Sequence, residues 1–174
     1  MSDLWDALVG EAAAESPLWA ESALPAAEQR RDAVFSALCE PRFALGVETI
    51  YEGYLLHFGR PRLFVPADAD TALLLGDYLY AHGLVRIAGT GSVDAVNDLA
   101  ELISLCAQAQ ADGTDGDWTV WAATASLLGA RTLEAPRASL RERRDASALE
   151  HAARVAVGDE AVERARVAHD LHVG

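Results

Sequence analysis

Residues 47–88 read VETIYEGYLLHFGRPRLFVPADADTALLLGDYLYAHGLVRIA, and the spacing of apolar residues in this stretch decides the predicted fold class. Apolar side chains recur at the spacing of amphipathic helices on both sides of a Gly-Arg-Pro break at 59–61. The pattern predicts one helix over about 42–58 and a long helix over 67–88. Between them, residues 63–66 are expected to be extended, because a residue that precedes proline avoids the helical region.

The rest of the chain shows the same helical spacing and no period-2 pattern of a half-buried strand. Further helices are predicted over about 4–12, 25–40, 94–111 and 118–129, with two more on either side of Gly158-Asp159. A polar loop over 112–117 and a linker over 133–136 separate some of them. We therefore expect an all-α helical bundle. Its core covers 1–132, and a C-terminal helical hairpin over 133–174 packs on it or on a partner, within a single domain overall.

Composition and charge limit the classes of partner. The chain has 174 residues, of which 51% are hydrophobic, as expected for one globular domain with its own core. The formal net charge is -13, and all 14 basic residues are arginines. Such an acidic surface without a basic stripe excludes nucleic acid and anionic membrane surfaces as expected partners.

Several features predict a cytoplasmic protein without a membrane span. Cys39 and Cys106 lie far apart in apolar contexts, so neither a disulfide framework nor a zinc site is expected. The most apolar window, 71–87, contains charged residues and falls short of the ~20 apolar residues that a membrane span needs. The N-terminal segment has no positive region followed by an apolar run, so no secretory signal is expected.

A series of fragments follows a recognisable order along the chain. They are Val47-Glu48 with Tyr51 and Leu55 to His57, then Gly59-Arg60-Pro61, then ALLLGDYL at 72–79, then Gln110, and finally Thr124 to Leu127. In this order they resemble the motifs of the trans-isoprenyl diphosphate synthase (polyprenyl synthetase) family. The resemblance extends from about Val47 to Gly129 and implies a helical bundle like part of the isoprenoid synthase fold, with a dimer built through its central helices.

The departures from that family concern its catalytic motifs. The family holds Mg²⁺ and the substrate diphosphate through two aspartate-rich motifs, and Mg²⁺ requires such oxygen ligands. Here His57 passes directly to Phe58-Gly59, so the first motif is missing, and no second motif follows Gly129. Ala123 stands in the position of the family's lysine. We therefore expect a non-catalytic protein with no catalytic residues, no metal site and no cofactor.

Five candidate ligand-binding residues lie in or beside the helix over 42–58. Glu48 and Glu52 are one turn apart and share a face, with His57 beyond them. Paired carboxylates suit acid–base chemistry or metal binding, although this spacing more often marks a solvated face. Arg60 and Arg62 suit an anion at the entrance of the next helix, or a surface loop that pairs with nearby acids.

The helix over 67–88 supplies the other three candidates, Asp77, Tyr78 and His82. Asp77 stands within the apolar run LLLGDYLY, so we expect its carboxylate to be buried against donors on a neighbouring helix, or else to bind a metal. Tyr78, His82 and Arg86 recur every four residues, as in a partly buried polar seam or a pocket wall.

Two further patterns predict packing. Ala72, Gly76 and Gly83 lie close to one face of the helix over 67–88, which indicates a close approach of backbones. His169 and His172 have the spacing of a helical metal pair, but no third ligand lies nearby. We expect a mobile C-terminus there.

Three functions remain open from the sequence. The first is an accessory or regulatory subunit of a prenyl synthase, active as a homodimer or as a heteromer with a prenyl synthase-type subunit. The second is a carrier or binding protein for a prenyl or other hydrophobic small molecule, with Arg60 or Arg62 at its polar head. The third is a divergent enzyme acting on isoprenyl diphosphates, in which Glu48, Glu52 and Asp77 would hold Mg²⁺.

Overall fold

The computed structural model describes residues 3–114 and 116–173, and every regular element in these ranges is a helix. In chain order the elements are α1 (Leu4–Glu15), α2 (Pro17–Ser22), η1 (Ser36–Leu38), η2 (Pro41–Phe43), α3 (Ala44–Phe58), α4 (Ala69–Ala88), α5 (Val93–Asp112), α6 (Asp117–Ser126), α7 (Glu134–Arg143), α8 (Ser147–Val157) and α9 (Asp159–Val173). The all-α prediction is confirmed. Within the described ranges, none of the helices has the length and apolar character to cross a membrane.

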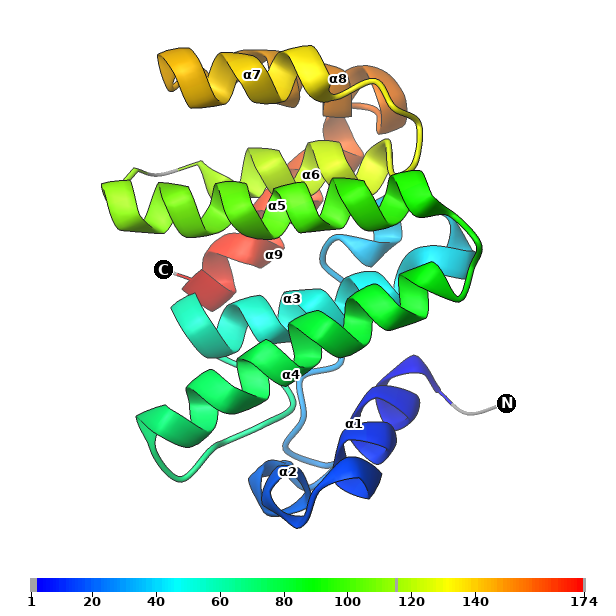
Figure 1. Ribbon diagram of the computed structural model, residues 1–174, viewed down its shortest axis with the longest axis vertical. Coiled ribbons are helices and arrows are strands. Elements are labelled where there is room, and N and C mark those ends of the chain that lie inside the picture. Colours follow the sequence, from blue (N-terminus) through cyan, green and yellow to red (C-terminus); the bar gives the residue numbers. More distant parts are fainter. Residues whose placement is uncertain (1–2, 115, 174) are drawn as a thin grey trace.

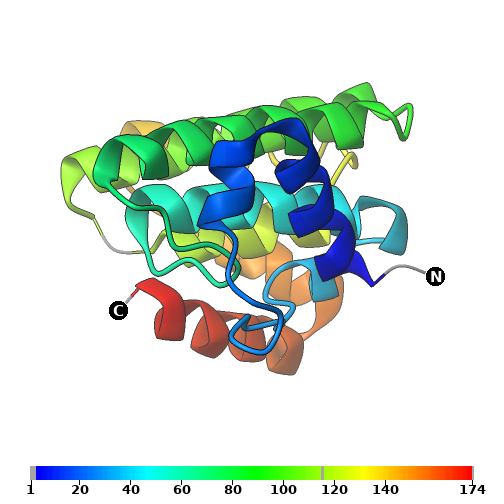
Figure 2. The same cartoon turned by 90° about the horizontal axis from the view of Figure 1, so that it is seen from below.

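The helices are stacked along the long axis of the molecule (Figure 1). α1 and α2 lie at one end, followed by the pair α3 and α4, then by α5 and α6, while α7 and α8 lie at the other end. α9 runs back along α6 and α3, so the C-terminal helix lies beside the middle of the bundle (Figures 1 and 2).

Glycines allow α3 and α4 to pack with their backbones close together. A Cβ built at Gly53 would lie 2.9 Å from the carbonyl oxygen of Gly76, and one built at Gly83 would lie 3.0 Å from that of Gly46. Real Cβ atoms rarely lie this close to a carbonyl oxygen, so the missing side chains let the two backbones approach. The close packing predicted for Gly76 and Gly83 is confirmed, while Ala72 is only half-buried.

The core consists of two clusters of buried apolar side chains. The larger lies among α3, α5, α6, α8 and α9 and includes the aromatic residues Phe35, Tyr51, Tyr54 and Trp121. The rings of Phe35 and Trp121 stack with their centroids 5.4 Å apart, and Tyr51 meets Trp121 edge-on at 5.0 Å. The smaller cluster joins α1 to α4 and includes Trp5. Aromatic packing therefore fixes how the central helices meet.

The tail packs on the same core as the central helices. α8 and α9 flank Gly158, as predicted, and contribute Leu149, Ala153, Val162 and Ala165 to the larger cluster. The division of the chain at 132–133 stays a prediction. The linker expected over 133–136 is wrong, because α7 begins at Glu134. Pro136 lies in its first turn, where the missing amide hydrogen removes no helical hydrogen bond.

The helix predicted over 25–40 is also wrong. This segment contains a turn and an irregular stretch, with only η1 in its second half. The backbone at its start is hydrogen-bonded to a distant segment instead: the amide of Leu24, just before it, donates to the carbonyl oxygen of Leu63 at 2.9 Å, and the amide of Arg30 donates to that of Arg62 at 3.1 Å. Long-range pairing has overridden the local helical spacing.

Candidate functional site

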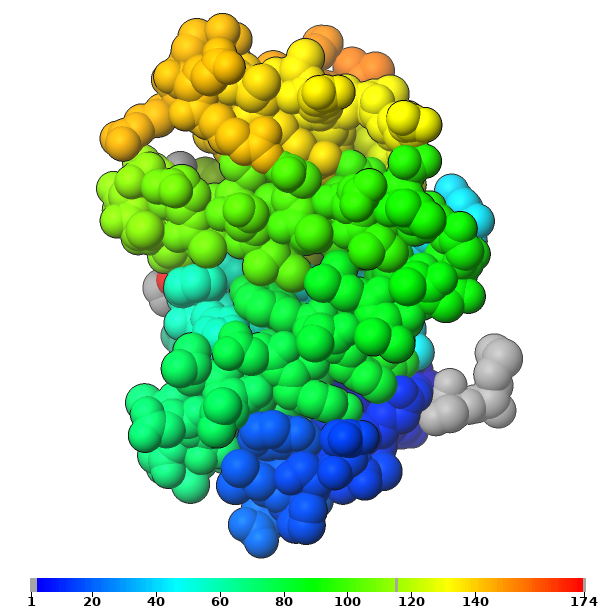
Figure 3. All heavy atoms as spheres, in the orientation of Figure 1, coloured from blue at the N-terminus to red at the C-terminus, as the bar shows by residue number. Residues whose placement is uncertain are grey.

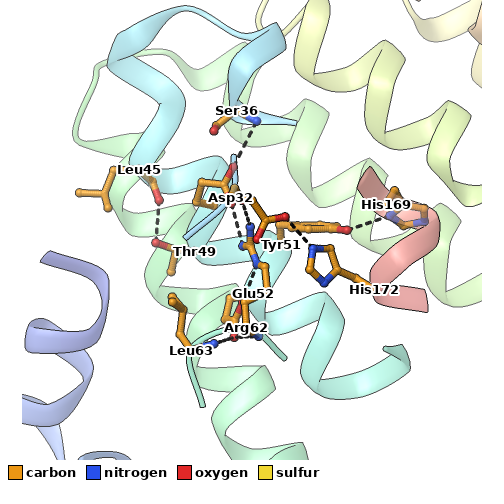
Figure 4. A network of polar contacts seen from close by, with 11 residues as sticks. Asp32, Ser36, Leu45, Thr49, Tyr51, Glu52, Arg62, Leu63, His169 and His172 are labelled. Atoms are coloured by element: carbon orange, nitrogen blue, oxygen red, sulfur yellow. Dashed lines mark hydrogen bonds and ion pairs between the residues drawn. The ribbon is translucent and has the colours of Figure 1, made fainter. Parts of the chain in front are cut away.

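Arg62 lies between Glu48 and Glu52 of α3, and all three side chains are fully buried. Arg62 Nη2 is 2.7 Å from Glu48 Oε2, and Arg62 Nε is 3.1 Å from Glu52 Oε2. Nη1 donates to the carbonyl oxygen of Asp32 at 2.6 Å, and the guanidinium carbon lies 4.8 Å from the centre of the Tyr51 ring. Figure 4 shows Arg62 among these partners. We call Glu48, Glu52 and Arg62 the Arg62 cluster.

Backbone amides complete the hydrogen bonding of the two carboxylates. Glu52 Oε1 accepts from the amides of Arg62 and Leu63, each at 2.8 Å, and Glu48 Oε1 accepts from the amide of Ser36 at 3.4 Å. Burial opposes the charge of the Arg62 guanidinium, but the two glutamates outweigh it and raise its pKa. The cluster is an ion network whose charges are matched inside the protein, as burial demands.

This arrangement corrects two expectations about the candidates. Glu48 and Glu52 do share a face of α3, but that face points into the protein and not into solvent, because Arg62 folds back onto it from the loop after α3. The surface loop expected at Arg60 and Arg62 is wrong for Arg62, which pairs with acidic side chains as expected but is buried, whereas Arg60 is exposed.

A second polar array crosses the interior from α3 to α9. The Tyr51 hydroxyl is hydrogen-bonded to His169 Nδ1 at 2.9 Å, and His169 Nε2 lies 3.4 Å from Asp117 Oδ1. The Tyr54 hydroxyl donates to Asp117 Oδ2, and Gln110 Nε2 donates to the Tyr54 hydroxyl at 3.1 Å. We call these five residues the His169 array, and they connect α3, α5, α6 and α9.

Asp117 is the ionised carboxyl of this array. Burial raises the pKa of Tyr51 and of Tyr54 far above the ordinary value, so both tyrosines are neutral hydroxyls. Burial also acts against the ionised form of Asp117, but the hydrogen bonds from His169 and Tyr54 outweigh it and lower the pKa of that carboxyl. Asp117 is therefore a carboxylate held by protein donors at the edge of the core.

His172, one turn beyond His169, makes a similar contact to the loop before α3. His172 Nε2 lies 2.8 Å from Asp32 Oδ2, and the His172 carbonyl oxygen accepts from the amide of Arg60 at 2.8 Å. His169 and His172 are only 1% and 2% exposed. The mobile C-terminus expected at these histidines is therefore wrong, because carboxylates on α6 and in the loop hold α9 in place.

Asp77 is exposed, whereas the sequence predicted a buried carboxylate. Its side chain is 64% exposed on the outer side of α4, and Oδ1 lies 3.2 Å from His57 Nε2 without the alignment of a hydrogen bond. The neighbouring Leu73 and Leu74 are also exposed, at 53% and 55%. The apolar run around Asp77 therefore marks an uncovered helix face, and Asp77 needs no buried donor there.

Tyr78, His82 and Arg86 form the polar seam between α4 and α1. The rings of Tyr78 and His82 stack at 5.3 Å, and His82 Nε2 and Arg86 Nη2 lie 3.0 Å and 2.6 Å from the same oxygen of Glu11. Trp19 of α2 stacks on Tyr78 at 5.9 Å. The prediction of a partly buried polar seam is confirmed. These side chains attach the N-terminal helices to α4.

Several hollows lie around the C-terminal half, and three of them bear on function. One of about 470 Å³ lies beside Asp117 and His169, and another of about 430 Å³ lies on the α7 side of Asp117. The third, of about 620 Å³, runs between residues 33–38 and α9 and is lined mainly by alanine, valine and leucine side chains. The Arg62 cluster lines none of these three hollows.

The described residues offer no cluster of three or more His, Cys, Asp or Glu side chains arranged for a metal ion. Glu48 and Glu52 are enclosed with Arg62, while Asp77 faces outward. Both cysteines are free thiols, and burial raises the pKa of Cys39 to about 12. The thiolate, which is the nucleophilic form of cysteine, is therefore suppressed at Cys39.

One pattern in the sequence indicates that the histidine of the His169 array is buried. Val162, Ala165, His169 and His172 recur at helical spacing, which places the two histidines on the stripe that buries the apolar residues of α9. No local pattern identified Asp117, which was expected to lie in a polar loop and instead begins α6. Its side-chain partners, Tyr54 and His169, come from two other helices, so only the tertiary fold brings them together.

Comparison with protein-family models, with curated proteins and with solved structures found no match for this chain. The resemblance to isoprenyl diphosphate synthases therefore rests on the sequence fragments of residues 47–129.

Proposed function

We propose that this chain is a non-catalytic, isoprenoid-synthase-like helical protein that works in a protein assembly, as an accessory or regulatory subunit of a prenyl synthase. The observation that carries the proposal is the uncovered outer side of α4 and α5. Figure 3 shows these two helices side by side across the middle of the molecule, with none of the other described elements covering their outer side.

We call this surface the α4–α5 face. Its members are exposed residues that recur at helical spacing along the two helices: Leu73, Leu74, Asp77, Ala81, Val85 and Ala88 of α4, and Val93, Asn97, Ala100, Ser104, Ala107 and Ala111 of α5. Leu73, Leu74, Val85 and Val93 are between 53% and 72% exposed. Asp77 carries the sole charge of the set, in a chain of net charge -13.

A face of this kind suits association with another helical subunit. Contiguous exposed apolar surface marks protein interaction sites, and two highly acidic molecules can approach closely only where their surfaces lack charge. Each 20-residue helix is about 30 Å long. Two such helices packed about 10 Å apart give a footprint of roughly 600 Å². That is near the ~800 Å² that each partner contributes to a standard interface.

The Arg62 cluster supports the non-catalytic part of the proposal. Glu48 and Glu52 are the carboxylates on the helix that resembles the metal-binding helix of the synthases, and both are saturated by Arg62 and backbone amides. A Mg²⁺ ion would have to displace a buried guanidinium to reach them. The divergent-enzyme alternative requires such displacement, and Mg²⁺-dependent turnover of an allylic diphosphate that is lost in Asp77→Asn would favour it.

The test is co-expression of the tagged chain with a prenyl synthase from the same genome, followed by purification on the tag. We expect a stoichiometric complex with the wild-type chain and its loss in the double variant Leu74→Glu, Val85→Glu. Val155→Glu is the matched control, because Val155 is 72% exposed but lies on α8. If the synthase co-purifies equally with the double variant, the assignment of the face is wrong, and no complex with any synthase contradicts the subunit role.

A carrier of a hydrophobic small molecule is the second candidate, and the groove between residues 33–38 and α9 favours it. This groove has a volume of about 620 Å³ and apolar walls that include Val34, Leu38 and Leu171. A carrier would release a prenyl lipid on solvent extraction and would gain thermal stability with prenyl alcohols. Neither result is expected of the subunit.

A further inference from the structure

The hollow of about 470 Å³ beside α9 opens onto the charged end of the His169 array. Its described walls come from the ends of α3, α5 and α9, from the start of α6 and from the loop residues Gly113, Thr114 and Gly116. They include Phe58, Gln110, Asp117, Trp118, His169 and Asp170. The volume falls within the ~300–1,000 Å³ of small-molecule sites. Two of the wall residues, Asp117 and His169, are buried, so packed side chains form the base of the hollow.

The described wall of this hollow carries negative charge. Asp117 and Asp170 are the charged acids of the wall, and no arginine belongs to the part of the wall that the structure describes. Gln110 donates one Nε2 hydrogen to Tyr54, and its carbonyl oxygen can accept from a cationic ligand. Asp170 is itself paired with Arg166 at 2.7 Å, so Asp117 is the main centre of negative charge.

Asp117 is fixed in its position and in its ionised form. Its Oδ1 accepts from the amide of Trp118 at 3.0 Å, its Oδ2 accepts from the Tyr54 hydroxyl, and His169 Nε2 lies 3.4 Å away. A carboxylate held in this way requires no rearrangement when it meets a charge, which is the advantage of a preorganised site. The contacts come from three elements, so the position of the carboxylate depends on the fold and not on one loop.

Aromatic side chains lie beside this carboxylate. Phe58 is 37% exposed at the end of α3, and Trp118 is half-buried on the first turn of α6. Aromatic faces attract cations, most strongly where water is partly excluded. Anions are disfavoured by Asp117 and by the net charge of -13.

We propose that this hollow is a binding site for a small organic cation, an ammonium or guanidinium compound, which pairs with Asp117 and packs against Phe58 and Trp118. The amine hydrogens donate to the Asp117 carboxylate and to the Gln110 carbonyl oxygen, and the alkyl part of the ligand lies along the aromatic wall. The site is separate from the α4–α5 face, so it stands whether or not the subunit role is correct.

The experiment is calorimetric titration of the purified chain with three probes: putrescine, agmatine and tetramethylammonium. Pyrophosphate serves as the anionic probe. We expect saturable binding of at least one cation at one site per chain, no binding of pyrophosphate, and quenching of tryptophan fluorescence that follows the same curve. Asp117→Asn keeps the shape of the side chain and removes its charge, and we expect it to weaken binding about tenfold or more.

Asp94→Asn is the matched control, because it removes the same charge at the opposite end of α5. It should leave cation binding unchanged, whereas diffuse attraction to an acidic protein would weaken in both variants alike. If Asp117→Asn fails to fold, Phe58→Ala takes its place, since Phe58 is partly exposed, and should weaken binding without changing its stoichiometry. Absence of saturable binding by all three cations, or equal binding by the wild type and the site variants, overturns the proposal.

Discussion

Arg62 Nη2 lies 2.7 Å from Glu48 Oε2, and both side chains are completely buried. This contact joins the loop after α3 to the middle of α3, and Glu52 extends it to the backbone of the same loop. Glu48, Glu52 and Arg62, which the sequence indicated as candidate ligand-binding residues, therefore hold the fold together. Removal of one of these partners leaves a buried charge without its counterion.

Arg62→Met leaves two carboxylates buried without their cation. Removing one partner of a buried ion pair costs about 3–5 kcal/mol of unfolding free energy, so we expect a loss of that size in urea denaturation monitored by circular dichroism. Arg60→Met, two residues away at an exposed position, is the control and should cost less than about 1 kcal/mol. Equal losses in the two variants would show that the Arg62 cluster does not stabilise the protein.

Gly83→Ala should separate α3 from α4. The new Cβ would overlap the side chain of Ile50 and lie 3.0 Å from the carbonyl oxygen of Gly46, so the helices must move apart. Overpacking of this kind costs about 1–3 kcal/mol. Gly10→Ala in α1 is the matched control, because nothing lies within 4 Å of its Cβ, and alanine stabilises a helix interior by about 0.5–1 kcal/mol. Thermal unfolding of both variants measures the difference, and a neutral Gly83→Ala would contradict the close packing.

Tyr51→Phe removes the hydroxyl that meets His169 Nδ1 at 2.9 Å. The imidazole nitrogen then stays buried without a partner, which costs about 1–3 kcal/mol. Tyr78→Phe is the control, since Tyr78 is half-buried and makes its contacts through its ring, with Trp19 and His82. Its unfolding free energy should stay within about 0.5 kcal/mol of the wild type. Denaturation of the two variants side by side decides whether the His169 array contributes to stability.

The stability of the chain should fall in acid partly through Asp117 and Asp32. The folded state lowers the pKa of both carboxyls below the ordinary 3.8: burial opposes ionisation in each, and hydrogen bonds from His169 to Asp117 and from His172 to Asp32 outweigh it. A lowered pKa gives stability that is complete above the unfolded value and is lost as the pH falls through the folded value.

The measurement is the melting temperature of the wild type and of Asp117→Asn between pH 7 and about pH 2.5. The difference between them should be constant at neutral pH and should shrink below about pH 4, because protonation then removes the charge of Asp117 in the wild type too. A difference that stays constant down to the lowest pH would mean that the Asp117 charge does not stabilise the fold.

The sequence predicted α3, α4 and α5 because their signals are local. Apolar spacing defines each helix, Pro61 separates the first two, and Asp68 caps α4 by accepting from the amide of Thr71 at 2.7 Å. It failed over 25–40, where the apolar spacing is helical but the backbone at Leu24 and Arg30 is hydrogen-bonded to Leu63 and Arg62. A partner so distant along the chain leaves no local pattern.

The sequence also failed at Asp77, for a reason that concerns function. A run of leucines around one aspartate predicts burial on both sides of a helix, yet Leu73 and Leu74 are more than half exposed. The sequence shows how apolar a helix is. Only the fold shows which side of that helix other parts of the chain bury. The uncovered side of α4 is the main reason to expect a partner.

The most direct test of this account is the mass of the purified chain in solution, measured by light scattering during gel filtration across a range of concentrations. Association through the α4–α5 face predicts a particle heavier than 18.5 kDa for the wild type, alone or with a prenyl synthase, and one of 18.5 kDa for Leu74→Glu, Val85→Glu under the same conditions. A wild-type chain that stays at 18.5 kDa at every concentration, alone and with a prenyl synthase, would contradict it.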